Sequence, residues 1–153
     1  MTTSDALVKL FDELLQGHDI PSASEVCRIS KPRAFESIDP LPYTFATNLR
    51  HAVLWQNFWL QRMRAGRNSP GMTEWNNDFR EPDPTEFESL RSEFIAGLEE
   101  CRSIAAGKID LPESVSQEAL VRDLILIAVH GAYHLGQMNM IKRTVAKKHR
   151  QEK

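Results

Sequence analysis

A chain of 153 residues with 41% hydrophobic content is long enough to bury one core without disulfides or a structural metal, so we expect a single domain over residues 1–153. The formal net charge of −2 provides no basic footprint of the kind that binds nucleic acid or an anionic membrane surface. The two cysteines stand far apart, no leader peptide is evident and no apolar run reaches the ~18 residues of a membrane span, so we expect a cytoplasmic protein.

From the start of the chain to residue 42, the sequence predicts one helix followed by a long crossover. Apolar residues recur with helical spacing at Leu7, Leu10, Phe11, Leu14 and Leu15. Thr3 or Ser4 is the expected N-cap of this helix, and Gly17 is the expected C-cap. Residues 18–42 contain four prolines, which exclude a long helix, although Ser22 and Glu25 have the spacing to cap one short turn.

The second predicted helix begins near Thr44 and ends near Arg64. Its apolar face is unusually wide and consists of Phe45, Leu49, Ala52, Leu54, Trp55, Phe58, Trp59 and Met63. A helix with such a face is expected to be largely buried. Residues 67–84 are rich in turn-forming residues and predict a second long loop. Trp75 is the large apolar residue of this loop and a candidate lid over a substrate.

Two further helices complete the prediction. The run Asp83-Pro84-Thr85-Glu86 offers an N-cap, a proline at the first helical position and a glutamate at the third, and Gly107 is the expected end of the third helix. The fourth and longest helix begins near Ser114 or Ser116 and continues past Met140. No segment shows the alternating pattern of a strand. Four amphipathic helices joined by two long crossovers predict an all-α fold, a four-helix bundle.

The fourth predicted helix carries His130 and His134, four residues apart. Four residues turn a helix by about 400°, so the two imidazoles point the same way, one turn apart. Such a pair can chelate a divalent ion, which then needs a ligand from elsewhere. His51 lies on the apolar side of the second predicted helix, with Leu54 and Trp55 at helical spacing. It is the expected third ligand.

A single buried histidine is more often a hydrogen-bonded core residue than a metal ligand. The histidine pair is flanked by Leu124, Ile127, Val129, Leu135 and Met138. Three core-facing histidines on two helices are hard to explain by packing, because an imidazole buried without a partner costs free energy. Bundles build metal sites from side chains on facing helices. We therefore predict a metal site formed by His51, His130 and His134.

Further polar residues near the histidines are candidates for supporting roles. Asn48 and Gln137 each lie one turn from a histidine, so either amide can hydrogen-bond a ligand or a bound water, or lie on the bundle surface. Tyr133 and Asp123 carry groups that can act as an acid or a base. Tyr133 fits better as a packed side chain, and Asp123 fits better as a surface charge near the start of the helix.

The motif HGAYHLGQ, together with the upstream helix HAVLWQNFWL, resembles the DinB/YfiT-like superfamily of metal-dependent enzymes. The resemblance extends over essentially the whole chain. It implies a four-helix bundle in an up-down-down-up arrangement, with a divalent metal bound by one histidine of the second helix and the H-x-x-x-H pair of the fourth. These positions match His51, His130 and His134. The aromatic cluster WQNFWL departs from simple family patterns and implies a bulkier pocket wall.

The resemblance also implies a homodimer and a set of reactions: thiol-dependent S-transfer with bacillithiol or mycothiol, maleylpyruvate isomerisation, and hydrolysis. Three imidazoles leave a divalent ion its full charge and at least one open position, so that a bound water or thiol becomes acidic. We thus expect S-transfer or hydrolysis on a small electrophilic substrate, with a low-molecular-weight thiol as a candidate partner. The ligand type does not decide among zinc, nickel, iron and manganese.

The alternative class is a non-catalytic stress or interaction protein, in which a closed metal site holds the bundle together. A fourth ligand such as Tyr133 or Gln137 would favour this alternative. The basic residues near the C-terminus are Lys142, Arg143, Lys147, Lys148, Arg150 and Lys153. Cations there complement the helix dipole, so they predict a solvated tail rather than a surface for nucleic acid.

Overall fold

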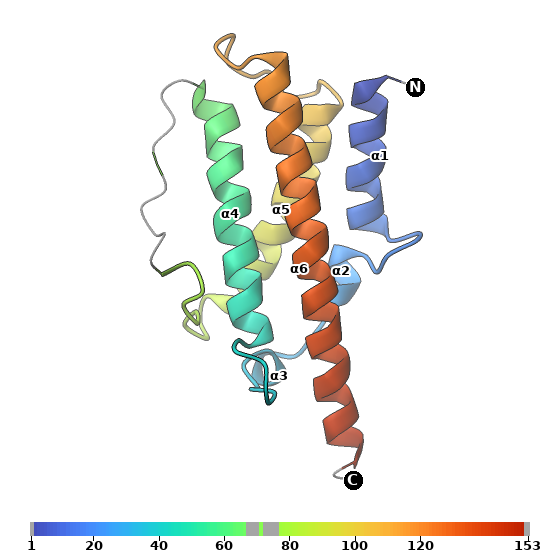
Figure 1. Ribbon diagram of the computed structural model, residues 1–153, viewed down its shortest axis with the longest axis vertical. Helices are drawn as coiled ribbons and strands as arrows, with labels where there is room; N and C mark the ends of the chain where they lie inside the picture. The colour runs from blue at the N-terminus through green and yellow to red at the C-terminus, as the bar shows by residue number, and fades with distance from the viewer. Residues whose placement is uncertain (1, 67–70, 72–76, 152–153) are drawn as a thin grey trace.

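The computed structural model describes residues 2–66, 71 and 77–151. Within these ranges the chain forms six α-helices and no strand, which confirms the predicted all-α class. The helices are α1 (Thr3–Gln16), α2 (Ala23–Val26), α3 (Lys31–Ala34), α4 (Phe45–Ala65), α5 (Phe87–Ala105) and α6 (Gln117–Gln151) (Figure 1). Trp75, the candidate lid, lies outside the described residues.

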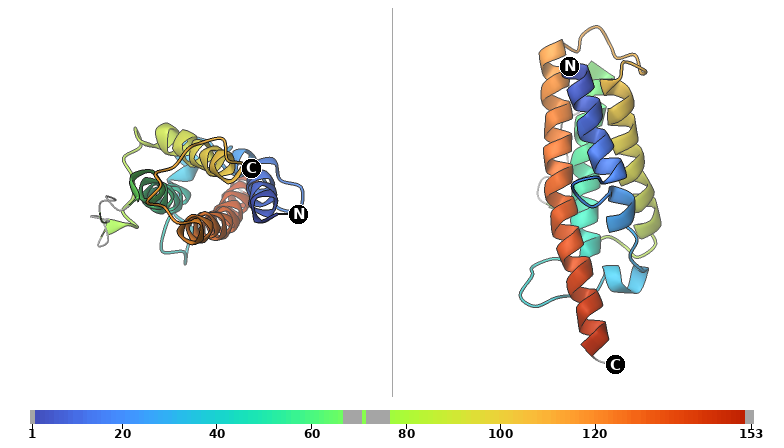
Figure 2. Two further views of the ribbon diagram at one scale, coloured as in Figure 1. Left: turned by 90° about the horizontal axis from the view of Figure 1, so that it is seen from above. Right: turned by 90° about the vertical axis from the view of Figure 1, so that its right-hand side faces the viewer.

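The four longest helices, α1, α4, α5 and α6, lie side by side along the long dimension of the molecule (Figure 2). Both α4 and α1 pack against α5 and α6. In Figure 1, α1 and α6 run in one direction, and α4 and α5 run in the other. Because α4 and α5 are consecutive and parallel, the connection between them must return along the length of the pair. This requirement explains the long segment between these two helices.

Helix α1 begins one or two residues earlier than predicted. Its N-cap is Thr2, whose hydroxyl accepts a hydrogen bond from the backbone N–H of Asp5, while the Asp5 carboxylate accepts one from the Thr2 N–H. Neither Thr3 nor Ser4 is the cap. The reciprocal pair is a capping box with aspartate at its acidic position. At the other end, Gly17 adopts the left-handed conformation with φ 73°, as predicted.

The crossover between α1 and α4 contains two short helices. α2 is the predicted turn, and the hydroxyl of Ser22 accepts a hydrogen bond from the backbone N–H of Glu25 at 3.2 Å. The sequence did not predict α3, which follows Ser30 and carries Pro32 in its first turn. A proline is tolerated there because the first turn of a helix does not use its N–H groups. Helix α4 then starts behind Thr44, as predicted.

The start of α5 corrects the predicted cap. The carboxylate of Asp83 accepts from the Thr85 N–H, and the Asp83 N–H donates to the Glu86 side chain at 2.6 Å. These contacts close a turn over residues 84–86, but the α-helix begins only at Phe87, and its N-cap Glu86 makes no side-chain capping hydrogen bond. The predicted motif therefore shapes the approach to the helix. At the far end, Gly107 follows α5 with φ 66°.

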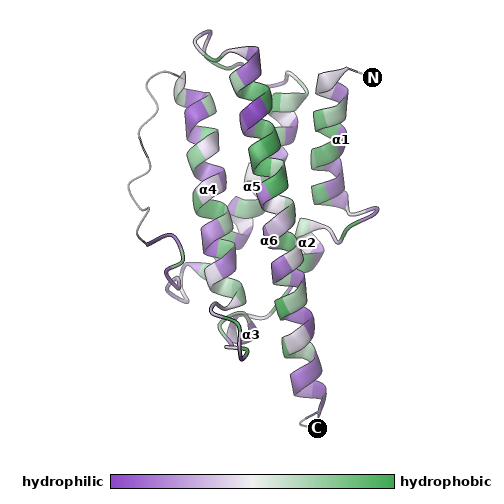
Figure 3. Ribbon diagram, viewed as in Figure 1, coloured by the Kyte–Doolittle hydropathy of each residue, from purple (hydrophilic) through white to green (hydrophobic). Residues whose placement is uncertain are grey.

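Helix α6 has 35 residues and extends beyond the other helices at its C-terminal end (Figure 2). Ser116 precedes it and accepts a hydrogen bond from Ala119, which decides between the two predicted starts. The last turns are hydrophilic (Figure 3), and Glu36 from the crossover accepts hydrogen bonds from Lys148 and His149. The predicted solvated tail is thus held in part by an ion pair. No described helix combines the length and apolar character needed to cross a bilayer.

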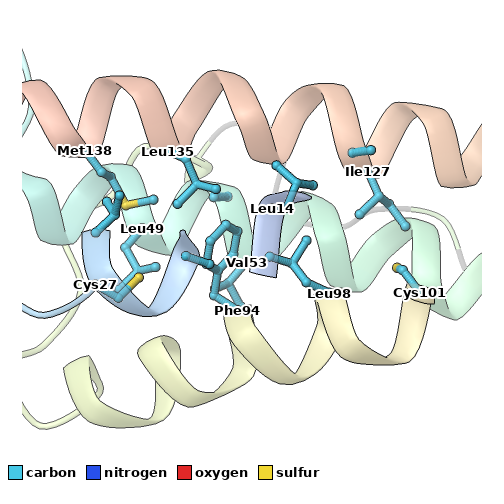
Figure 4. Packing of buried hydrophobic residues seen from close by; sticks show 14 of the residues in the cluster. Leu14, Cys27, Leu49, Val53, Phe94, Leu98, Cys101, Ile127, Leu135 and Met138 are labelled. Atoms are coloured by element: carbon cyan, nitrogen blue, oxygen red, sulfur yellow. The ribbon is translucent and has the colours of Figure 1, made fainter. Parts of the chain in front are cut away.

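Apolar side chains from all six helices form one buried cluster, part of which is seen in Figure 4. Its largest fully buried members include Phe11, Phe45, Phe87 and Phe94. Burial of such surface is the main favourable contribution to folding. The two cysteines, Cys27 and Cys101, are buried in this cluster as free thiols, and burial raises the pKa of both, that of Cys27 to about 11. They are packing residues, because a protonated buried thiol is inert.

Gln56 is a buried polar residue at the contact between α4 and α5. Only 2% of the residue is exposed, and its Nε2 donates to the main-chain oxygens of Glu93 and Phe94 at 3.3 and 3.1 Å. Gly97 makes room for this side chain, because a Cβ atom at that position would lie 1.7 Å from Gln56 Nε2. The close approach of α4 and α5 therefore depends on a glycine opposite a glutamine.

We predict that Gly97→Ala lowers the free energy of unfolding by about 1–3 kcal/mol, because the added methyl group displaces the Gln56 amide from its two carbonyl partners. The matched control is Gly131→Ala, a buried glycine of α6 at which a Cβ atom would meet Leu98 Cδ2 at an ordinary 3.7 Å. That variant should be neutral or more stable, since alanine is the better helix former. Chemical denaturation measures both changes, and equal stability of the two variants would contradict the prediction.

Candidate metal centre

Helices α4 and α6 bring the three predicted ligands together. His51 comes from α4, and His130 and His134 come from consecutive turns of α6. Nε2 of His130 lies 3.3 Å from Nε2 of His51 and 3.1 Å from Nε2 of His134. One ligand atom from each residue lies within 4.8 Å of the other two. His51 and His134 are buried and His130 is half-buried, so the three imidazoles converge between the two helices.

Asn48 fixes the protonation pattern of His134. Asn48 is fully buried, and its Oδ1 lies 2.6 Å from Nδ1 of His134. Its amide nitrogen donates to Oε1 of Gln137 at 2.9 Å, which leaves the amide oxygen to accept from the histidine. The proton of neutral His134 is then on Nδ1, and Nε2 presents a lone pair to the other histidines. Both candidate supporting amides thus lie at the site: Gln137 orients the Asn48 amide, and Asn48 orients His134.

The residue that sequence reasoning missed is Asp78. Its Oδ2 lies 3.4 Å from Nδ1 of His51 and accepts a hydrogen bond from Trp55 Nε1 at 3.4 Å. The contact with His51 is electrostatic, because Nδ1 has no hydrogen-bond partner of good geometry in the described part of the chain. A nearby carboxylate still favours the proton on Nδ1, and therefore a lone pair on Nε2 of His51. In the sequence, the signal for this role is weak: Asp78 is an acidic residue in a long predicted loop, and loops often carry binding residues.

Arg50 fastens the segment that carries Asp78 to helix α4. The arginine is 7% exposed, and its Nη1 donates to the main-chain oxygens of Asn77 and Asp78 at 3.0 and 3.1 Å. A buried guanidinium is costly unless its donors are satisfied, and two main-chain oxygens provide acceptors here. Residues 77 and 78, at the end of the segment between α4 and α5, are therefore held beside His51 by Arg50, which directly precedes His51 in the chain.

The nitrogen separations fit a small divalent ion. At a metal–nitrogen distance of about 2.0–2.1 Å, tetrahedral ligands lie about 3.3–3.4 Å apart. The two Nε2 separations that involve His130, 3.1 and 3.3 Å, are close to this value. Hydrogen bonds satisfy the cluster less well, because the single proton that His130 Nε2 can carry would have to serve two lone pairs. A cation bound to these lone pairs would remove that deficit.

Burial keeps the imidazoles neutral. Desolvation lowers the pKa of His130 to about 4 and that of His134 to about 3, and the neighbouring histidines add to both shifts. Desolvation also lowers the pKa of His51, against the opposing effect of Asp78. Neutral imidazole is the form that binds a metal, so the cluster is competent to do so at neutral pH.

The apolar stripes of α4 and α6 are buried as predicted except at a few positions. Most of the predicted face of α4 is buried, including Phe45, Leu49 and Met63, and Leu60 joins it as a buried residue that the prediction left out. Val129 is 62% exposed instead of facing the core, and Leu54 is only partly buried. The histidines therefore line the edge of the core rather than its centre, which explains why His130 keeps part of its surface exposed.

Tyr133 and Asp123 both occupy environments opposite to those expected. Tyr133 is 61% exposed, and its ring meets that of His134 edge to face with centroids 5.0 Å apart. Asp123 is 3% exposed and pairs with Arg122 and Arg62 at 3.0 and 3.4 Å. The tyrosine thus lies at the surface beside the histidines, whereas the aspartate is paired with two partly exposed arginines and does not belong to the histidine cluster.

Comparison of the chain with protein-family models, curated proteins and solved structures finds no match. The assignment of a function therefore depends on the chemistry of the site.

We predict that Asn48→Leu weakens zinc binding by roughly 10–100-fold, because His134 loses the acceptor that keeps its proton on Nδ1. Titration with zinc against a competing chelator measures the change. The matched control is Asn57→Leu, which removes an amide of the same helix that hydrogen-bonds Glu93 instead of a histidine. Unaltered zinc affinity in Asn48→Leu would show that the amide has no influence on the ligand.

We also predict that the metal-free protein loses stability when the pH falls from 7 to 5. The pKa values of His130 and His134 are about 4 and 3 in the folded state against 6.5 for an unperturbed histidine, so unfolding takes up protons below pH 6.5. Their contribution to stability is present above that pH and is lost as the pH falls toward the folded-state values. Denaturant titrations in a chelator should show a smaller loss for the double variant His130→Gln/His134→Gln. Equal losses would count against the shifted pKa values.

Proposed function

We propose that the protein is a metal-dependent enzyme, in which His51, His130 and His134 hold a divalent ion and leave at least one coordination position for water or substrate. The observation that carries this proposal is the convergence of three imidazoles, with Nε2 of His130 lying 3.3 and 3.1 Å from the Nε2 atoms of His51 and His134. In the described ranges, no cysteine, carboxylate or fourth histidine joins the group. Three protein ligands are typical of catalytic zinc, whereas structural zinc has four.

A divalent ion held by neutral imidazoles lowers the pKa of a coordinated water or thiol. Two reaction classes suit such a site. In hydrolysis, the oxygen of water bonds to the electrophilic atom of the substrate, the bond to the leaving group breaks, and the leaving group takes up a proton. In S-transfer, the sulfur of a low-molecular-weight thiol bonds to an electrophilic carbon, the leaving group departs with its electron pair, and the thiol proton passes to solvent. Zinc, nickel, iron and manganese all accept nitrogen ligands of this type.

We further propose that the protein is a DinB/YfiT-like four-helix bundle in the up-down-down-up arrangement. The directions of α1, α4, α5 and α6 in Figure 1 support this assignment. The placement of the histidines on the second and fourth of these long helices supports it as well. A homodimer and a cytoplasmic location stay predictions.

The alternative, a non-catalytic stress or interaction protein, requires a closed metal site. Gln137 and Tyr133 are the side chains that could close it. The oxygen of Gln137 accepts a hydrogen bond from Asn48, and the ring of Tyr133 is largely exposed. Both observations favour an open site over a closed one.

Wild-type protein, loaded with zinc and then dialysed, is expected to retain about one equivalent of metal. His51→Ala and His134→Ala should retain far less, because each removes one of three ligands. His18→Ala, which changes an exposed histidine after α1, should retain as much as the wild type. Elemental analysis gives the metal content and circular dichroism checks the fold. Equal metal in the wild type and the site variants would refute the metal centre.

A second measurement separates an enzyme from a structural metal protein. Zinc-loaded protein is screened with low-molecular-weight thiols and with electrophilic or hydrolysable substrates. Turnover that disappears in His51→Ala supports the enzyme. A protein that unfolds when zinc is removed, and that turns over no substrate in the screen, supports the alternative.

A further inference from the structure

The outer face of α6 is apolar along the middle of the helix. Between Arg122 and Arg143, the exposed residues of α6 carry no charge, and they are Ile125, Leu126, Val129, Tyr133, Gly136 and Met140. We call these residues the apolar face. Val129, Tyr133 and Met140 are its most exposed side chains, at 62, 61 and 71%. Figure 3 shows that hydrophobic residues occupy the middle of α6, whereas its last turns are hydrophilic.

The neighbouring helix α5 differs from α6 in what it presents to solvent. Its exposed positions carry mainly polar side chains, which include Glu88, Ser89, Ser92, Glu93 and Glu99. In the part of the chain that the structure describes, no segment covers the apolar face of α6. A contiguous apolar patch of this kind marks a surface that binds another molecule, because its burial removes apolar area from water. The apolar face is therefore a contact surface.

The spacing within the apolar face is that of a helix that packs against another helix. Leu126, Val129, Tyr133, Gly136 and Met140 follow one another at alternating steps of three and four residues. This spacing keeps them on one stripe about 21 Å long. A Cβ atom at Gly136 would have no neighbour within 4 Å, so the glycine leaves a shallow hollow in the stripe. A large side chain of an opposing helix can fill such a hollow.

Charges at the two ends of the apolar face select a second copy of this chain as its partner. Glu118 precedes the face, Arg143 and Lys147 follow it, and all three are exposed. A second α6 that runs in the opposite direction brings the acidic end of one copy to the basic end of the other. A parallel copy would instead set Arg143 against Arg143 and Lys147 against Lys147, and like charges repel. The face is thus self-complementary about a two-fold axis, as the interface of a homodimer must be.

We propose that the apolar faces of two copies pack against each other in a homodimer, with their α6 helices antiparallel and the two-fold axis near residue 131. In this register, Leu126 of one copy lies opposite Gly136 of the second copy and fills the hollow there. Arg122 lies opposite Met140, where the aliphatic stem of the arginine covers the methionine and its charged end stays in water.

Tyr133 joins this interface to the histidine cluster. Its ring belongs to the apolar face and also meets the ring of His134 edge to face, with centroids 5.0 Å apart. The second copy therefore covers the α6 side of the histidine cluster. The inference goes beyond the function proposed above and does not need the metal, because no histidine belongs to the apolar face.

Sedimentation velocity of the full chain at micromolar concentrations, in the presence of a chelator, tests the interface. The wild type is expected to sediment as a dimer. Val129→Glu should dimerise roughly 100-fold more weakly, because the interface would bury a carboxylate without a partner. The matched control is Leu10→Glu, which introduces the same charge at a 38% exposed position of α1 and should dimerise as the wild type does. Circular dichroism checks that both variants fold.

Reversal of the end charges tests the antiparallel arrangement. In the proposed register, Glu118 lies beside Arg143 of the second copy. Glu118→Arg and Arg143→Glu should each weaken the dimer by about 3–10-fold at low salt, because each places like charges together. The double variant Glu118→Arg/Arg143→Glu exchanges the two ends and should regain the affinity of the wild type. In a parallel dimer the double variant would regain nothing, since each residue would face its own copy.

A wild type that sediments as a monomer would overturn the proposal, and so would a Val129→Glu variant that dimerises like the wild type. Equal weakening by Leu10→Glu would also contradict it, because the effect would then not be specific to α6. A double charge variant as weak as the single ones would refute the antiparallel arrangement. Since the chelator removes the metal, none of these outcomes depends on the metal centre, which the zinc analysis described above tests on its own.

Discussion

The packing of α6 against α4 is the contact on which the site depends. It places His51 and His130, 79 residues apart in the chain, with their Nε2 atoms 3.3 Å from one another. The same contact sets Asn48 of α4 against His134 of α6. A ligand on one helix is thus oriented by an amide on the other, so a small shift between the helices would disturb both the metal-binding nitrogens and the group that fixes their protonation.

The topology explains why a loop takes part in the site. Since α4 and α5 run in parallel (Figure 1), the chain between them has to travel back along the molecule before α5 can begin. Its last part passes the histidines, where Arg50 holds the main chain of Asn77 and Asp78. This segment between α4 and α5 places the Asp78 carboxylate and the Phe79 ring against His51. The end of the long connection between α4 and α5 therefore forms part of the surroundings of His51.

The histidine cluster is a local weakness in an otherwise well-packed fold. Its imidazoles are desolvated and neutral, and their nitrogens share too few protons to satisfy one another. The apolar cluster of all six helices offsets this deficit. A ligand that binds the folded state only, such as a metal ion, would add its binding free energy to the stability of the fold. A cluster that is costly without a ligand and favourable with one is what a binding site requires.

Local patterns predicted much of the fold. The helical period and the caps at Gly17, Ser22 and Thr44 agree with the structure, because a cap depends on a few neighbouring residues. The motif at Asp83 shows the limit of such reasoning: its hydrogen bonds form, but the chain continues as a turn before the helix starts. Boundaries of this kind depend on how the neighbouring segments pack as well as on the local sequence.

The sequence by itself determined that the chain is helical and that His130 and His134 point the same way, since four residues are close to one helical turn. Only the tertiary structure decided that His51 completes the group, that Asp78 and Phe79 lie against it, and that Val129 and Tyr133 face solvent. The physical reason is that the period of a helix is a local property, whereas the rotation and register of one helix on another depend on the packing of the whole core.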